Sequence, residues 1–344
     1  MHGRFLALLA AIVVLLQCAL CRPLTAQAGS CTGRHEWIYG TQPPGIGLYT
    51  SNCEMTSWMV LDCWDLPTSA CAPAASPTET QPRCPSCGSP IVVATGNTYI
   101  EQTDISVPGL GNGLRLTRTW NSLWPTTQSA SQIGLFGPNW RSTYEERVFV
   151  GSDGYMKYAR GDGSFWSFGY NTAAGGPLYA VASPANASAT LAQGTTSWIL
   201  TFHNGEQRYF DLTSGNLTAI VDRNGNTTTL SYDSVGRLVS VTDPASRQIN
   251  FNYGNSSPYL ITSVTSNIGV SVSYVYDTSA RLSTVTEPDG SRLSFQYDSN
   301  SFISAVLDSN AQVLEMHTYD SVGRGLTSSR ANGVDAVTVS YSNQ

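Results

Sequence analysis

The chain has 344 residues, a formal net charge of −6 and only 12% charged residues, roughly half the usual share, so its surface must consist mainly of uncharged polar side chains. Eighteen Lys and Arg against 24 Asp and Glu argue against a nucleic-acid-binding surface, because that affinity comes from clustered basic charge. Lys157 is the only lysine and thus the single candidate for lysine-based catalysis, while 31 Gly and 17 Pro favour turns and short strands over long helices.

Residues 1–28 have the pattern of a secretory signal peptide. His2 and Arg4 precede an apolar run over 5–16, and Ala26-Gln27-Ala28 is a small-x-small cleavage site. The run is too short to span a bilayer, and Cys21 lacks the small preceding residue typical of a lipidated cysteine. The pattern predicts an exported protein, secreted or at the cell surface, with a mature charge of −8 and no membrane span.

Residues 29–89 are predicted to form a small disulfide-tied module that ends in a Pro-, Thr- and Ser-rich linker. An even number of cysteines in an exported chain indicates disulfides, with 15 possible pairings for six cysteines. The spacing of Cys84 and Cys87 also fits a metal knuckle or a redox pair, and both alternatives remain open beside the favoured disulfides. The disulfide candidates are Cys31, Cys53, Cys63, Cys71, Cys84 and Cys87.

Residues 90–198 alternate strand-like runs with Gly, Asn and Asp turns and predict a β segment. Within it, Gly109-Leu-Gly-Asn-Gly113 superficially suggests a phosphate loop. It lacks a following helix pattern and a phosphate-binding lysine, so it is interpreted as a turn.

Residues 199–344 are periodic. Aromatic residues, most followed by Asp, recur every 21 to 23 residues, which predicts about six units of a repeat architecture. After each aromatic, Asp accepts backbone N–H bonds and Gly takes a positive φ in an Asp-x-x-Gly turn. A strand follows whose apolar residues are three apart, such as Leu238 and Val241, so a β-bulge or a twist is expected there.

Each unit is therefore predicted to be a two-stranded antiparallel ribbon, and stacked units to form one long sheet. The chain is expected to be all-β: an antiparallel repeat sheet preceded by the disulfide-tied module. The repeat positions assigned to turns and core are Tyr232, Asp233, Gly236, Arg237, Tyr276, Asp277, Tyr297, Asp298, Tyr319, Asp320 and Gly323.

The run Tyr-Asp-Ser-Val-Gly-Arg-Leu-Val-Ser-Val-Thr-Asp-Pro at 232–244 resembles the consensus of Rhs, or YD-repeat, proteins, and 276–290 matches almost as well. Upstream, 90–99, 114–122 and 134–141 resemble the segment that precedes the repeats in bacterial members. The resemblance implies a β-sheet that spirals into a hollow shell around a C-terminal toxin, or a similar shell in cell adhesion.

Six units are far fewer than such a shell needs, so the chain is expected to form only part of a wall. It lacks the acidic Asp-Pro-Gly segment with which full-length members cap the shell and cut the toxin free. The last unit is degenerate, since Gly325 and Ser328 stand where other units have Leu or Ile and Val. A capping role, decay or a truncated coding sequence would each explain this degeneracy.

The sequence shows no catalytic constellation. His203 reads as part of a turn, and His317 lies two residues before a repeat tyrosine, outside any recognised motif. The repeat aspartates are interpreted as turn caps rather than calcium ligands, since calcium loops gather several acids. The expectation is no enzyme, no metal and no cofactor.

The leading hypothesis is an exported, non-catalytic scaffold that encloses or binds another polypeptide in a toxin or surface-interaction system. A strand edge at 337–341 is expected to invite a partner strand. The first alternative is a carbohydrate-binding surface module, in which a glycan stacks on Tyr155, Tyr158, Phe165, Trp166 and Phe168. A hydrolase is the remaining alternative.

Overall fold

The computed structural model describes residues 91–92, 95–124, 133–171, 178–184, 186–254 and 258–341. In this part of the chain the regular structure is antiparallel β, with two single 3-10 turns, η1 (Leu110–Asn112) and η2 (Ala331–Gly333). The prediction of an all-β, antiparallel fold is confirmed. The predicted cysteine module lies outside the described residues, and its disulfides stay a prediction.

The strands fall into a short inner group and a long sheet. The inner group comprises β1 (Tyr99–Val107), β2 (Leu114–Asn121), β3 (Ile133–Gly134), β4 (Gly137–Pro138) and β5 (Trp140–Ser142). The long sheet begins with β6 (Arg147–Val150), β7 (Met156–Ala159), β8 (Phe165–Asn171), β9 (Leu178–Ser183), β10 (Ala189–Gln193), β11 (Ser197–Phe202), β12 (Gln207–Asp211) and β13 (Leu217–Val221). It continues with β14 (Thr227–Tyr232), β15 (Leu238–Thr242), β16 (Gln248–Tyr253), β17 (Ile261–Ser266), β18 (Ser271–Tyr276), β19 (Leu282–Thr286), β20 (Arg292–Tyr297), β21 (Ile303–Leu307), β22 (Val313–Tyr319), β23 (Gly325–Arg330) and β24 (Val337–Thr338).

In the long sheet each strand pairs with the next in sequence, and the sheet closes on itself through β6 and the start of β13. Arg147 bridges Asn216, and the Val148 N–H donates to the Gly215 carbonyl at 2.9 Å. A Cβ on Gly215, which has φ +70°, would lie 1.9 Å from the Val148 carbonyl oxygen. Only glycine therefore lets β6 come this close, and β6 to β13 form a ring.

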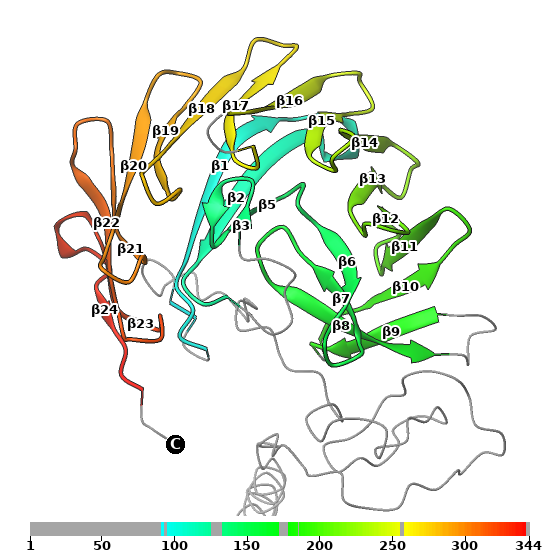
Figure 1. Ribbon diagram of the computed structural model, residues 1–344, viewed down its shortest axis with the longest axis horizontal. Coiled ribbons are helices and arrows are strands. Elements are labelled where there is room, and N and C mark those ends of the chain that lie inside the picture. The colour runs from blue at the N-terminus through cyan, green and yellow to red at the C-terminus, as the bar shows by residue number, and fades with distance from the viewer. Residues whose placement is uncertain are drawn as a thin grey trace, which may run out of the picture.

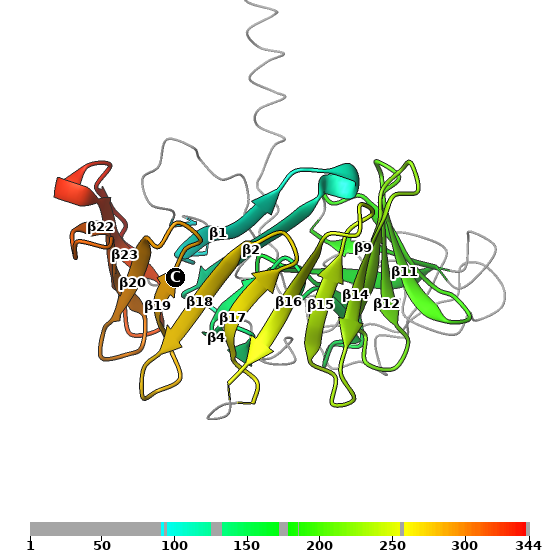
Figure 2. The same cartoon turned by 90° about the horizontal axis from the view of Figure 1, so that it is seen from above.

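Beyond the ring, β14 to β24 form a curved wall of ribbons that stand side by side (Figures 1 and 2). Tyr232 is paired with Leu238 while Ser231 is paired with Ser240, so Val239 is an extra residue in β15. The same shift recurs in β17, β19 and β21. The bulge expected from the three-residue apolar spacing is confirmed, and it brings both apolar residues of each strand to the inner face.

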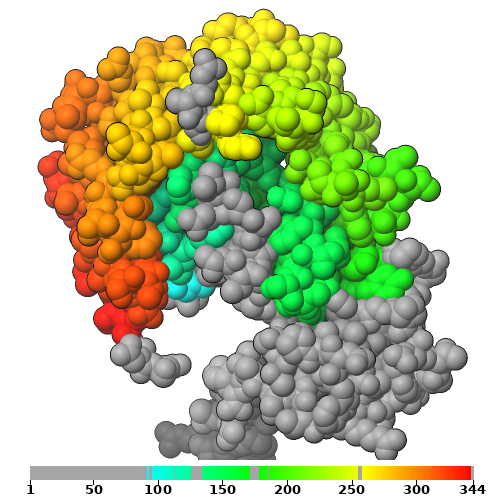
Figure 3. Space-filling view, in the orientation of Figure 1, coloured from blue at the N-terminus to red at the C-terminus, as the bar shows by residue number. Residues whose placement is uncertain are grey.

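The concave side of the wall is covered by the inner sheet, which has the order β1–β2–β5 (Figures 1 and 3). Large aromatic residues of this sheet and of the neighbouring β3–β4 hairpin meet aromatic residues of the wall edge to face. The pairs are Phe136 with Tyr274 at 5.0 Å, Trp140 with Phe295 at 5.4 Å and Trp120 with Tyr319 at 6.1 Å between ring centroids. The core of the molecule thus lies between the inner sheet and the wall.

Candidate functional site: repeat junctions and inner layer

The repeat tyrosines join neighbouring units. Each hydroxyl donates, at 2.7 to 2.8 Å, to the carbonyl of the residue that opens the second strand of the unit before it. Burial of these phenols is the main reason that the pKa of Tyr253 lies well above its ordinary value. The donors and acceptors are Tyr232 to Leu217, Tyr253 to Leu238, Tyr276 to Ile261, Tyr297 to Leu282, Tyr319 to Ile303 and Tyr341 to Gly325.

The aspartate that follows the tyrosine holds the turn. Asp233 Oδ1 accepts from the backbone N–H groups of Val235 and Arg237 at 3.1 and 2.9 Å, and its Oδ2 accepts from Arg237 Nε at 2.7 Å. These hydrogen bonds, with the Arg237 backbone first, lower the pKa of Asp233. Gly236 takes φ +83° in this turn. Asp277 and Asp320 hold Arg281 and Arg324 in the same way.

The residue four places after the aspartate reaches the next unit. Arg237 lies over the ring of Tyr253 at 4.7 Å from its centroid, and Arg281 lies over Tyr297 at 4.4 Å. After Asp298 this position is Phe302, which packs on Tyr319 with ring centroids 5.1 Å apart. The junction is therefore a Tyr–Asp–Arg unit, and the sequence alone did not indicate the forward contact of the arginine.

Replacing Tyr253 by phenylalanine is expected to lower the free energy of unfolding by about 1 kcal/mol, because the hydrogen bond to the Leu238 carbonyl is lost while the ring remains. Urea denaturation followed by tryptophan fluorescence measures this loss. Tyr259→Phe is the matched control, since Tyr259 is 68% exposed. Equal stability of the two variants would contradict a structural role for the hydroxyl.

The degenerate last unit has a steric cause. A Cβ on Gly325 would lie 2.3 Å from Thr98 Oγ1 and 3.0 Å from two side-chain carbons of Ile91, and the Gly325 N–H donates to the Gly96 carbonyl at 2.8 Å. The segment before β1 thus occupies the space that Leu or Ile fills in other units. Glycine at this position is complementary to that segment, and this accounts for the departure from the repeat pattern.

His317 and Ser328 replace an apolar pair of the other units. They are directly opposite in β22 and β23, as Phe295 and Val306 are in β20 and β21. Ser328 Oγ lies 3.1 Å from His317 Nδ1, and His317 Nε2 lies 3.4 Å from a Glu315 carboxylate oxygen. Ser328, His317 and Glu315 are the residue types of a hydrolytic triad, but Ser328 is 1% exposed and His317 is 3% exposed. A substrate cannot reach this serine in the described conformation.

The single lysine is also buried. Lys157 Nζ donates to Asp153 Oδ2 at 2.6 Å and to Ser167 Oγ at 2.7 Å, between the rings of Tyr155 and Phe165. Its side chain has no exposed surface, and burial lowers its pKa. These contacts give Lys157 a structural place rather than a catalytic one.

The aromatic residues that motivated a carbohydrate-binding face lie mostly in the core. Tyr155, Tyr158, Phe165 and Phe168 are between 0 and 4% exposed, and Trp166 is partly buried against Tyr158. They do not form an exposed stacking platform within the described ranges.

A buried ion pair joins the inner sheet to the wall. Arg118 Nε contacts both carboxylate oxygens of Asp104, at 3.0 and 2.8 Å, and the Tyr274 hydroxyl donates to Asp104 Oδ2 at 2.8 Å. The guanidinium carbon lies 4.7 Å from the centre of the Trp140 ring. Burial, and then the Asp104 charge, raise the pKa of the nearby Glu287 to about 7, against the opposing effect of Arg118.

The raised pKa of Glu287 predicts a pH-dependent stability. The folded protein keeps the proton to about pH 7 while the unfolded chain releases it near pH 4.5, so stability is expected to fall as pH rises between these values. Glu287→Gln is expected to remove this loss, on the order of 1 kcal/mol after solvent screening of a half-buried group. Urea denaturation at pH 4 and pH 8 measures this loss of stability. The control is Asp335→Asn, because the Asp335 side chain is exposed. If wild type and Glu287→Gln lose the same stability between the two pH values, the prediction is wrong.

Two kinds of feature are absent from the described residues. They contain no group of three or more His, Cys, Asp or Glu side chains placed to hold a metal ion. No helix within the described ranges is long and apolar enough to cross a membrane.

Comparison with known families agrees with the repeat geometry. Residues 211–248 match the RHS repeat, and residues 88–168 match a domain of unknown function, DUF6531. Residues 211–248 therefore have the sequence of an RHS repeat. The DUF6531 match covers the inner sheet and the first strands of the ring, so this domain supplies the inner layer on which the repeat ribbons pack.

Curated relatives are much longer than this chain. The tRNA nuclease WapA of Bacillus subtilis strain 168 is 30% identical over 145 residues, which are 42% of this chain and 6% of that protein. The tRNA3(Ser)-specific nuclease WapA of Bacillus spizizenii gives the same figures. The chain thus spans a small fraction of the length of the relatives it matches.

Solved structures give a weaker likeness. The crystal structure of TcdB2-TccC3 without its hypervariable C-terminal region is 12% identical, with a TM-score of 0.24 over 72% of this chain and 20% of that one. A Tc holotoxin pore of Photorhabdus luminescens is 14% identical, with a TM-score of 0.25 over 71% of this chain and 14% of that one. Neither likeness bears on function.

Proposed function

We propose that this protein is an exported, non-catalytic RHS-repeat scaffold that holds another polypeptide as part of a toxin or surface-interaction system. The observation that carries the proposal is the open edge of β24. Among the described strands β24 has a register with β23 alone, through Val337 with Ser328 and Thr338 with Thr327. The Val339 N–H continues this pairing by donating to the Leu326 carbonyl at 2.8 Å.

The pairing of Val337 and Val339 with β23 leaves the N–H and C=O groups of Thr338 and Ser340 directed to the other side of the strand. A strand edge of this kind accepts an antiparallel strand of a partner through main-chain hydrogen bonds. Because the Tyr341 hydroxyl donates a hydrogen bond to the Gly325 carbonyl, the edge is held in strand conformation before a partner binds.

The matches to RHS repeats and to nucleases named WapA support a toxin-associated setting. The scaffold is proposed to need no metal and no cofactor. The proposed domain organisation of the chain is a signal peptide over 1–28, a cysteine-rich module over 29–89, a β segment over 90–198 and repeats over 199–344. Cleavage after Ala28 would leave Gly29 as the first residue of the exported protein.

The test is cross-linking mass spectrometry on the protein recovered from its own host's extracellular fraction. We expect cross-links from residues 335–341 to a second polypeptide, and an N-terminus at Gly29. Thr338→Pro and Ser340→Pro are expected to abolish these cross-links at unchanged stability, since each removes an N–H that points away from β23. Val339→Pro is the control that breaks the existing pairing with β23. A monomer without cross-links would overturn the proposal.

A further inference from the structure

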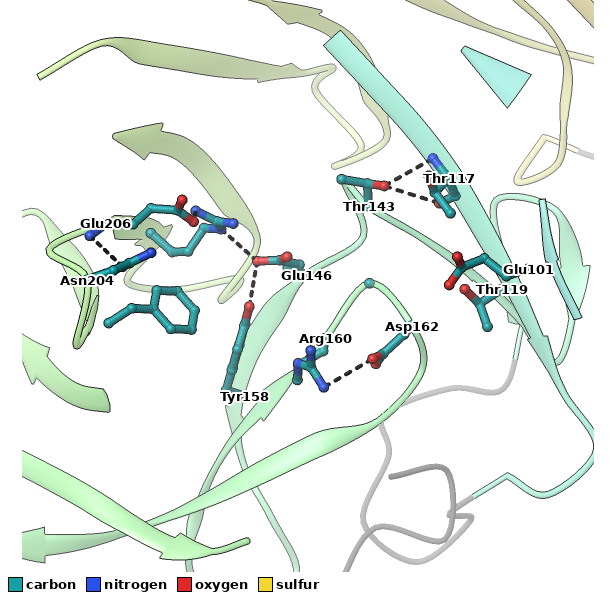
Figure 4. A pocket seen from close by; sticks show the side chains of 13 residues that line it. Glu101, Thr117, Thr119, Thr143, Glu146, Tyr158, Arg160, Asp162, Asn204 and Glu206 are labelled. Atoms are coloured by element: carbon teal, nitrogen blue, oxygen red, sulfur yellow. Dashed lines mark hydrogen bonds and ion pairs between the residues drawn. The ribbon is translucent and has the colours of Figure 1, made fainter. Parts of the chain in front are cut away.

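A polar pocket lies where the inner sheet meets the ring. Its volume is about 330 Å³ (Figure 4). The lining comes from β1 and β2, from the connection between β5 and β6, from β7 with the turn that follows, and from β11 and β12 with the turn between them. Neither the repeat pattern nor the strand edge involves these residues. The side chains that carry the argument are Glu146, Tyr158, Arg160, Asp162, Glu206 and Arg208.

Glu146 is the centre of this pocket. It is 9% exposed, and both of its hydrogen bonds fall on Oε2, from the Tyr158 hydroxyl at 2.8 Å and from Arg208 Nε at 3.1 Å. Oε1 receives no hydrogen bond from any described residue. Burial raises the pKa of Glu146 against the opposing charge of Arg208, so the carboxylate is incompletely compensated.

The other charged groups do not complete that compensation. Arg208 is shared with Glu206, to which its Nη1 also donates, and Arg160 is paired with Asp162 at 3.0 Å. The three carboxylates of Glu146, Asp162 and Glu206 share the two guanidinium groups of Arg160 and Arg208, which leaves an excess charge of −1 among these five side chains.

The remaining lining suits a ligand with an apolar stem. Phe202 and Tyr158 supply ring surface beside the carboxylates, and their rings lie 6.1 Å apart between centroids. A cation against such rings gains electrostatic attraction in addition to its hydrogen bonds. An anion would face the excess negative charge, because both guanidinium groups are already engaged.

We propose that this pocket binds the basic side chain, guanidinium or ammonium, of a bound polypeptide, with Glu146 Oε1 and Glu206 as acceptors. The biological source of that side chain rests on the proposed scaffold function. The cation selectivity of the pocket is independent of that function, and small molecules test it directly.

The experiment compares N-acetyl-arginine amide with N-acetyl-citrulline amide, its neutral counterpart, by NMR titration of the purified protein. We expect the arginine compound to bind at least tenfold more tightly, with affinity that falls as salt rises. Glu206→Gln is expected to weaken arginine binding about tenfold while citrulline binding stays the same. Glu146→Gln is expected to do so more strongly.

Asn300→Ala is the matched control, because Asn300 lines a separate cavity of about 530 Å³ between β2 and the repeat turns. Equal affinity for the two amides, no binding up to 100 mM, or unchanged arginine affinity in Glu206→Gln would overturn the proposal. Competition by monosaccharides in place of arginine would also overturn it. If the pocket binds cations selectively but the protein forms no cross-links at β24, the proposed scaffold function is rejected and the pocket proposal stands.

Discussion

Replacing Asp104 by leucine is expected to lower the free energy of unfolding by about 3–5 kcal/mol, because it leaves the Arg118 guanidinium buried without its counter-ion. Neither side chain of the pair has exposed surface. The change also removes the acceptor of the Tyr274 hydroxyl, so the inner sheet and β18 lose their polar connection. Guanidinium chloride denaturation followed by tryptophan fluorescence measures the loss.

The double variant Asp104→Leu with Arg118→Met is the control for this prediction. Apolar replacement of both partners removes the uncompensated charge, so the double variant is expected to recover most of the stability lost in the single one. A double variant as unstable as the sum of its single variants would show that the two charges are not coupled.

Restoring the repeat consensus at Gly325 is expected to destabilise the protein. Gly325→Leu puts a side chain into space held by Thr98 and Ile91, which costs about 3 kcal/mol through overpacking. The same denaturation experiment measures it, and Gly325→Leu combined with Ile91→Ala is expected to recover part of the loss. A stabilised Gly325→Leu variant would show that the last unit had decayed from the consensus.

The spacing of aromatic and apolar residues predicted the wall in detail. A period of 21 to 23 residues fixed the ribbons, and the Leu238 to Val241 spacing located the bulge, because both signals arise within one unit. Asp233 and Gly236 were also predictable, since turn chemistry acts over four residues.

Contacts between distant segments carried no local signal. Arg118 with Asp104 and Tyr274, and Ile91 with Gly325, join residues that only the folded sheet brings together. The pocket at Glu146 could not be predicted for the same reason, because its lining comes from strands far apart in the sequence. The ring closure depends on a single glycine approach at Gly215, which looks like any other turn in the sequence.

The inner layer is made long before the surface that covers it. Trp140 packs on Phe295, which is synthesised about 150 residues later. The delay between the two residues is roughly 10–30 s at ordinary rates of synthesis. During that time Trp120, Phe136 and Trp140 lack their partners and present an apolar surface to other chains. The protein is therefore most vulnerable to aggregation while it is still being made, and slower elongation across the repeats would lengthen the period of risk.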